Sequence, residues 1–578
     1  MSNLALRQMA ELRILYPEYG NLDYKELLKG ISKETLIKFA TMLIGKNIFY
    51  KEPPENNAII DEWFSDGNRL FGDDMLARIK AYEAKTGSQL SIVYNISLLK
   101  VLQAGLELNE AKDQPLKSDA QAEIDLMMAL LVLNQNEDCN HTKDSEKLKE
   151  MFDEELHLSA LMLNYGFATQ DITNFDLKVY TINQIIKFLL LFLFLETNEI
   201  GKQLIERFCK YYGFTKWQEY ILAVFPIVLP WVEQQKAGAV DIVLEKNDRY
   251  DDNLQFLTKF ALSDYAEIDD KDYIKLREKP LIQLDETTFR AIHPIFVADK
   301  IYKGQFFLLK KLNDEAPPLS GNFRQWFTTN FSEGYCFAEL IRYAFPGADA
   351  VFFDHELQDK GVVGPPDGYI RFGNDLCLLE NKDILIGAAI KESYDLEALL
   401  KELKKKLLLE GTRPVGIGQL VTNIRKLLDG TNNFDEGFSD TDTNIYPLIV
   451  LHDPMFDTPG LNKILNDLMQ KELTKLKDDG LNTDRVKPLT LVNIDTLIQV
   501  APSLADGRVN LKELLDHFAL NMTSKPDPAK HTAEQAEQIY GNSTLPFSVV
   551  AYNYMQGRFS GTWHSEALMA KLLAKAAI

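Results

Sequence analysis

Apolar positions recur every three or four residues through the first 250 residues of the chain, which is typical of helices. This spacing predicts helices over 24–45, 120–133, 146–163 and 181–195, with a polar break at 134–144. After about residue 280 the pattern changes, and short apolar runs alternate with helical segments. We therefore expect a helical front part and a back part that contains a sheet.

The back part alternates short strands with longer helices, which is an α/β arrangement. The pattern predicts strands at 350–354, 368–372, 376–386, 446–452 and 489–493, and helices at 331–345, 394–410, 416–429, 461–477 and from Asp495. The expected fold is multidomain, with a mainly α-helical N-terminal domain followed by an α/β domain with a mixed central sheet. The expected domains are 1–280, 281–524 and a C-terminal extension, 525–578, with a closing helix.

The most informative segment is a hairpin between residues 365 and 386. Gly373-Asn374 is a two-residue turn signal between two strand-like runs. Opposed residues in such a hairpin have position numbers with a constant sum, so Asp367 falls opposite Glu380. Directly opposed Cβ atoms lie about 4.5–5.5 Å apart. Two carboxylates at that distance would repel each other unless they share a hard divalent cation.

Strand alternation adds a lysine to this pair. Side chains two residues apart share a face, so Leu376, Leu378, Glu380 and Lys382 point the same way. A metal between two carboxylates polarises a phosphoryl group and acidifies a water. The neighbouring lysine can orient that water or stabilise developing charge. This combination favours hydrolysis of a phosphodiester.

These residues resemble a known family. Pro366-Asp367, a short spacer and Glu380-Asn381-Lys382 in a hairpin resemble the PD-(D/E)xK nuclease superfamily, the restriction-endonuclease-like fold, over about residues 325–455. The resemblance implies that Asp367 and Glu380 bind Mg²⁺, with Mn²⁺ as an alternative. It also implies that Lys382 is catalytic and that the backbone carbonyl of Asn381 is a further metal ligand.

Many members of that family carry two accessory residues. On the helix at 331–345, Glu333 lies four residues before Phe337 on the apolar stripe, and Glu339 faces away, so Glu333 is the expected accessory acid. Gln419 is the nearest candidate for the glutamine of the following helix, although it lies at the edge of that helix's apolar face. His452 and Asp453 are read as a strand-end turn in preference to a second metal site, because no other histidine is nearby.

Composition and charge limit the partners. The 578 residues are 46% hydrophobic and 26% charged, with 63 Lys+Arg against 85 Asp+Glu and a net charge of −22. Such a chain repels polyanions on average, so nucleic-acid binding needs a local basic surface. Residues 401–430 hold seven Lys/Arg against three acids. A solvated helix face explains this cluster equally well. The candidate phosphate contacts are Lys401, Lys404, Lys405, Lys406 and Arg413.

The chain has the features of a cytoplasmic protein. Its four cysteines are far apart and form no CxxC pair, which fits a reducing compartment. The N-terminal residues lack an apolar core, so no secretory signal is expected. The longest apolar run, 188–195, is bracketed by Lys187 and Glu196 and is too short for a bilayer, which needs about 20 residues. We expect it to be a buried helix, and we expect no membrane partner.

The sequence therefore predicts a Mg²⁺-dependent nuclease that acts on DNA in preference to RNA. By resemblance alone, a role in prokaryotic restriction or phage defence is expected, and a protein partner or a second copy of the chain is left open. The alternative is a non-catalytic helical scaffold that carries a degenerate nuclease fold. A third hypothesis, an inhibitor that mimics DNA, is weaker because the acidic residues are spread along the chain.

Overall fold

The structure of the chain is a computed structural model. It describes residues 8–49, 55–108, 115–142, 145–173, 176–232, 239–263, 270–432, 434–558 and 565–578.

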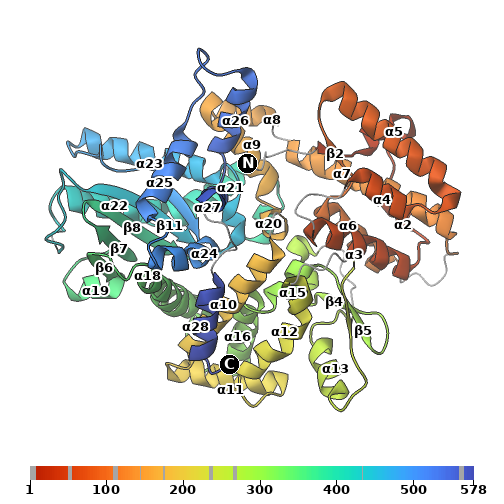
Figure 1. Ribbon diagram of the computed structural model, residues 1–578, viewed down its shortest axis with the longest axis horizontal. Coiled ribbons are helices and arrows are strands. Elements are labelled where there is room, and N and C mark those ends of the chain that lie inside the picture. The colour runs from red at the N-terminus through yellow and green to blue at the C-terminus, as the bar shows by residue number, and fades with distance from the viewer. Residues whose placement is uncertain are drawn as a thin grey trace.

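The first part of the chain is a helical bundle, red to orange in Figure 1. Its helices are α1 (Leu12–Leu15), α2 (Tyr24–Leu28), α3 (Lys33–Phe49), α4 (Asn56–Trp63), α5 (Arg69–Thr86), α6 (Asn95–Leu108) and α7 (Asp119–Thr142). A short parallel pair, β1 (Gln8–Met9) and β2 (Leu90–Ser91), joins its beginning to its middle. One hydrophobic core, built mainly from residues 10–133, holds the bundle together.

Helix α7 continues through the polar stretch that was expected to end it. The buried Asn134 side chain donates hydrogen bonds to the backbone carbonyls of Ala10 and Ile92, and Lys100 pairs with buried Glu137. Because these polar groups find partners inside the bundle, they do not break the helix. The expected helix over 24–45 is two helices, α2 and α3.

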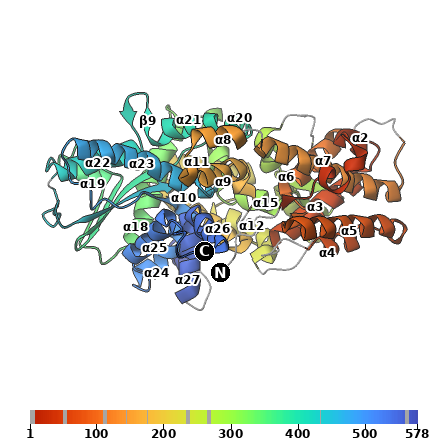
Figure 2. The same cartoon turned by 90° about the horizontal axis from the view of Figure 1, so that it is seen from above.

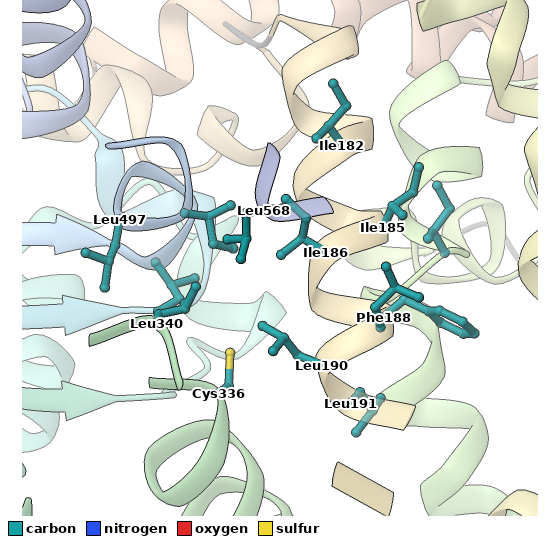
Figure 3. Close-up of a cluster of buried hydrophobic side chains, with 14 of the residues drawn as sticks. Ile182, Ile185, Ile186, Phe188, Leu190, Leu191, Cys336, Leu340, Leu497 and Leu568 are labelled. Atoms are coloured by element: carbon teal, nitrogen blue, oxygen red, sulfur yellow. The ribbon is translucent and has the colours of Figure 1, made fainter. Parts of the chain in front are cut away.

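Helix α10 (Leu177–Leu195) runs through the centre of the molecule, surrounded by other helices (Figure 1). It is long and apolar enough to cross a membrane, but 89% of its most apolar 18-residue stretch is buried inside the protein. Lys187 is buried as well and pairs with Asp495 at 2.6 Å. Ile186 and Leu190 point toward Cys336, Leu340, Leu497 and Leu568, which come from four other helical elements (Figure 3). The expected buried helix is therefore observed, and its composition follows from its place in the core.

The helices α11 (Glu199–Tyr212), α12 (Gln218–Val232) and α13 (Tyr250–Thr258) share a core with α10. The helices α8 (Ser145–Met151) and α9 (Glu154–Gly166) contribute to a different core, which they share with residues 461–478. A small antiparallel sheet has the spatial order β3 (Asp241–Val243), β5 (Thr288–Ala291), β4 (Leu281–Gln283), and both α13 and α14 (Ile274–Glu278) lie between β3 and β4 in the chain. Two further helices, α15 (Pro294–Asp299) and α16 (Lys303–Glu315), lead from this sheet to the α/β part.

The α/β part is built on a mixed five-stranded sheet. Its strands are β6 (Ala350–Phe353), β7 (Gly368–Phe372), β8 (Asp375–Lys382), β11 (Asn444–Leu451) and β12 (Thr490–Asn493). The spatial order is β12-β11-β8-β7-β6. The β6–β7 and β7–β8 pairs are antiparallel, whereas β8–β11 and β11–β12 are parallel. The sequence order of helix, three strands, helices and strand is the expected one.

Helices cover both faces of this sheet (Figure 2). One face packs on α18 (Ala338–Ala344) and α24 (Ile494–Ala505), and the other on α21 (Leu396–Leu407), α22 (Ile417–Leu428) and α23 (Leu461–Asp478). Short elements between them are α17 (Phe323–Trp326), α19 (Asp354–Asp359), α20 (Ala388–Lys391), β9 (Leu409–Glu410) and β10 (Arg413–Pro414). The chain ends in α25 (Leu511–Thr523), α26 (Ala533–Ser543), α27 (Phe547–Arg558) and α28 (Ser565–Lys575), the last lying on α10.

The hydrophobic cores cut across the expected boundary at residue 280. Residues of α10–α12 share a core with α18, with one face of the five-stranded sheet and with the C-terminal helices. The segment 273–296 contributes to two cores: Tyr273, Leu276, Ile282, Ile292 and Phe296 pack in the core of the N-terminal bundle, and Leu281, Phe289, Ala291 and Ile295 pack in the core around α10. The α/β part is thus packed against the helical front part, and α10 is the central element of that contact.

Candidate functional site

The β7–β8 hairpin has the register that the turn signal predicts. Gly368 pairs with Leu379 and Phe372 with Asp375, which leaves Gly373 and Asn374 in the turn. Gly373 has a φ of +53°, a conformation that favours glycine. Asp367 directly precedes β7 and therefore falls opposite Glu380.

Lys382 joins the two carboxylates. Its Nζ lies 3.1 Å from Oδ2 of Asp367 and 2.8 Å from Oε2 of Glu380. The backbone N–H of Asn381 donates a hydrogen bond of 2.7 Å to the same Asp367 oxygen. Glu380 is fully buried, whereas the side chains of Asp367 and Lys382 remain 17% and 14% exposed. The structure thus brings the three predicted residues into direct contact, with Glu380 and Lys382 on one face of β8.

Burial shifts the pKa values of the charged groups in this cluster. It raises the pKa of Glu380 well above its usual value, and the charge of Asp367 adds to the effect while Lys382 opposes it. Burial alone would lower the pKa of Lys382, but the charges of Asp367 and Glu380 raise it. Apart from Lys382, no described donor reaches the buried oxygens of Glu380. A buried carboxylate with so few partners is costly, so it favours binding of a cation.

Two more carboxylates, those of Glu333 and Asp354, interact electrostatically with Asp367. Burial raises the pKa of Glu333 to about 7, and the charge of Asp367 contributes. Burial also raises the pKa of Asp354, again with a contribution from Asp367. Glu333 is the predicted accessory acid. Asp354 is not among the residues predicted for the site, although it directly follows β6, next to the hairpin; a carboxylate at the end of a neighbouring strand is the signal that indicates it.

Glu333 belongs to a helix that differs from the expected one. Residues Phe327–Phe337 form a π-helical segment between α17 and α18, so the helix begins at Phe323 and its early part does not follow α-helical spacing. π-Helical segments occur frequently at functional sites. The aromatic ring of Phe337 lies so close to Gly368 that a Cβ there would meet it at 3.0 Å. This close packing brings the helix against the start of β7, beside Asp367.

Replacing Glu333 by glutamine should stabilise the metal-free protein at pH 8 and have little effect at pH 5. A carboxyl whose pKa is raised on folding costs stability once it must ionise, so the cost develops between pH 4.5 and about 7 and is complete above that. A shift of this size corresponds to at most about 3 kcal/mol, and residual exposure reduces it. Thermal unfolding of wild type and E333Q at both pH values measures the difference; an equal difference at both would contradict this account.

The donor set at the hairpin fits a divalent cation. In a strand the N–H and C=O of one residue point to the same side, so the Asn381 carbonyl faces the Asp367 side along with its N–H. Asp367, Glu380 and this carbonyl supply the oxygen ligands that Mg²⁺ prefers. Within the described residues, no three His, Cys, Asp or Glu side chains already form a complete metal site. The candidate metal centre is therefore the Asp367–Glu380 pair, whose charge the Lys382 ammonium balances in the absence of a metal ion.

A second network fixes Asn381 from the opposite face of β8. Its Nδ2 donates to the carbonyl of Ser332, which leaves Oδ1 to accept from Nε2 of His452 at 2.9 Å. Ser332 also donates to Asp383, which Arg324 binds at 2.7 Å. His452 therefore holds the strand next to Asp367, and Asp453 caps the following short helix, Pro454–Asp457. Both residues act as the predicted strand-end turn.

Gln419 does not join the carboxylates in the described part of the chain. Its Oε1 accepts a hydrogen bond from the N–H of Gly416 and so caps α22. Because α22 leads back to the start of β11, its first turn lies toward the sheet edge at which β8 ends. The side chain itself has a structural partner, and this explains a glutamine at that position without catalysis.

The predicted phosphate contacts lie on α21 and the β9–β10 hairpin that follows it. Lys401, Lys404 and Lys405 are exposed. Lys406 pairs with Glu402 at 3.3 Å, and Arg413, whose side chain is 74% exposed, pairs with Glu410 at 2.8 Å. The hairpin projects from the molecule beside α21 (Figure 2). Three lysines are thus available on this surface, while two of the predicted cations are partly neutralised.

Comparisons with models of known protein families, with curated proteins and with solved structures find no match to this chain. Its function therefore has to be argued from the chemistry of the site.

Proposed function

We propose that this chain is a Mg²⁺-dependent nuclease of the PD-(D/E)xK type. The observation that carries the proposal is the contact of Lys382 with both Asp367 and Glu380, across a hairpin whose register was expected from the sequence. A mixed sheet with the hairpin at its centre, preceded by a helix that carries Glu333, supports the same proposal.

Each residue then has a chemical role. Asp367, Glu380 and the Asn381 carbonyl would hold the metal, which when bound polarises a phosphoryl oxygen and acidifies a water. Lys382 Nζ can stabilise the charge that develops on the phosphate. Glu333, with a pKa of about 7, can accept or release a proton at its carboxyl near neutral pH. Asn381 orients Asp367 through its N–H.

Exposed lysines and the family resemblance indicate the substrate and the setting. The exposed lysines of α21 are available for phosphates, and DNA is favoured over RNA because most members of the resembled family act on DNA. A cytoplasmic location and a role in restriction or phage defence belong to the same proposal. The second candidate function is a non-catalytic scaffold, favoured by the full burial of Glu380 and by the lack of a complete metal site among the described residues.

Cleavage assays separate these two functions. Supercoiled plasmid, single-stranded DNA and RNA are incubated with wild type, Glu380→Gln and the surface control Asp467→Asn, in Mg²⁺, Mn²⁺ or EDTA. The proposal predicts metal-dependent cleavage by wild type and the control but not by Glu380→Gln. Cleavage that is equal in all three proteins would exclude this site. Absence of cleavage, together with a melting temperature that no metal changes, would favour the scaffold.

A further inference from the structure

A surface hollow lies beside α16, the helix that connects the small antiparallel sheet to the α/β part along the chain. Its volume is about 720 Å³, and its walls are Phe306, Phe307, Lys310, Lys311, Arg324 and Leu385, with Asp314 and Glu315 at the end of α16. A smaller cavity of about 70 Å³ shares Phe306, Phe307, Arg324 and Leu385 with it. This inner cavity extends to His452, which binds Asn381. The hollow therefore leads from the surface to the carboxyl end of β8, on the face opposite to Glu380 and Lys382.

The walls combine exposed apolar surface with positive charge. The side chains of Phe307 and Leu385 are 56% and 41% exposed, so together they give the hollow an apolar wall that a ligand can cover. Lys311 is exposed and makes no ion pair among the described residues, whereas Lys310 pairs with Asp314 at 2.5 Å. Phe307 and Lys311 are four residues apart on α16, so they share one helix face.

We propose that this hollow binds the single-stranded part of a nucleic-acid substrate, with Phe307 stacked on a base and Lys311 in contact with a phosphate. Proteins that bind single strands combine aromatic stacking platforms with cations along the backbone path. The volume lies within the range of about 300–1,000 Å³ of small-ligand pockets, which suits a nucleotide or two and not a double helix. The inference rests on the proposed nuclease function, because the strand is taken to continue into that site.

The position of Leu385 connects the hollow with the proposed chemistry. Leu385 follows Lys382 by three residues, so at most about 11 Å of chain separates their Cα atoms. Arg324, in the wall, binds both the side chain and the backbone of Asp383, the residue after Lys382. A strand held at Phe307 and Lys311 therefore passes close to the end of β8. This continuity favours a nucleic acid over an acidic peptide as the occupant.

Binding measured without cleavage tests the hollow. Fluorescence anisotropy of a labelled single-stranded oligonucleotide, as DNA and as RNA, is recorded in EDTA with wild type, Phe307→Ala and Phe307→Trp. The control is Phe225→Ala, at an exposed phenylalanine of α12. Loss of one stacked base, about 1–3 kcal/mol, predicts about 5- to 150-fold weaker binding by Phe307→Ala. Phe307→Trp and the control should bind as wild type does, and duplex binding should change little.

Salt dependence tests the phosphate contact. Lys311→Ala should reduce the magnitude of the negative slope of log K against log salt by about 0.7, the value for one phosphate of a single strand. Replacing the exposed Lys471 by alanine should leave this slope unchanged. If Phe307→Ala weakens binding but the wild-type protein cleaves no nucleic acid, the result would support single-strand binding in the hollow and contradict the proposed nuclease function. If wild type cleaves nucleic acid but Phe307→Ala binds single strands as well as wild type does, the nuclease function would be supported and binding in the hollow would be contradicted. Failure of wild type to bind any single strand, or preference for an acidic peptide, would overturn the inference.

Discussion

Replacing Lys382 by methionine should reduce the rate of DNA cleavage at least about 100-fold, the loss typical of removing one group that stabilises developing charge. In the metal-free protein, its ammonium is the cation between Asp367 and Glu380, at 3.1 and 2.8 Å. Methionine keeps the length of the side chain and removes the charge. Initial rates of plasmid cleavage in Mg²⁺, measured with wild type and Lys382→Met, give the effect.

Stability requires a separate control in that experiment. Removing one partner of a buried ion pair costs about 3–5 kcal/mol, so Lys382→Met is expected to melt at a lower temperature near neutral pH. Lys382→Arg keeps the charge but presents a wide, planar group in place of a compact ammonium. It should fold more stably than Lys382→Met and still cleave poorly. Full activity in a folded Lys382→Met protein would show that the lysine has no part in catalysis.

Replacing Lys391 by methionine should lower the free energy of unfolding by about 3–5 kcal/mol, because it removes one partner of a buried ion pair and leaves Asp171 and Asp272 with one cation fewer. The Lys391 side chain is 1% exposed and binds Asp171 at 2.8 Å and Asp272 at 2.6 Å. Arg277 binds the same two carboxylates, and Lys303 joins Asp171 to Asp453. Burial would raise the pKa of Asp171, but Arg277 and the two lysines hold it below its usual range. This cluster joins the helical front part to the segments that follow β8 and β11.

Chemical denaturation of Lys391→Met beside Lys471→Met measures this contribution. Lys471 pairs with Asp467 on the surface, where such a pair contributes about 0–1 kcal/mol. Equal, small losses in the two variants would mean that the buried cluster does not hold the two parts together. A selective loss in Lys391→Met would support one cooperative unit, in line with the shared core around α10.

Local patterns in the sequence were sufficient to predict the geometry of the β7–β8 hairpin. The register of β7 and β8 depends only on a two-residue turn, and the shared face of Glu380 and Lys382 depends only on strand alternation. The mixed sheet and the buried apolar helix also follow from local periodicity, although α10 is longer than the run that revealed it. These features required no knowledge of distant contacts.

Features that depend on tertiary contacts could not be predicted in the same way. Helix α7 continues past residue 134 because Asn134 finds partners in Ala10 and Ile92, far away in the sequence. The π-helical segment around Glu333 is set by packing, and the role of Asp354 depends on where β6 lies beside β7. Gln419 matches a family pattern but caps a helix, a function that its spacing from Gly416 would also have indicated.

Calorimetric titration with Mn²⁺ tests most directly whether Asp367 and Glu380 form a metal site. Wild type, Asp367→Asn, Glu380→Gln and the surface control Asp467→Asn are titrated at pH 8, where Glu333 is ionised. We expect wild type and the control to bind Mn²⁺ with the same affinity, and the two site variants to bind it at least about ten times more weakly, as the loss of a charged ligand implies. Equal binding by all four proteins, or no binding by wild type, would contradict the proposed metal site.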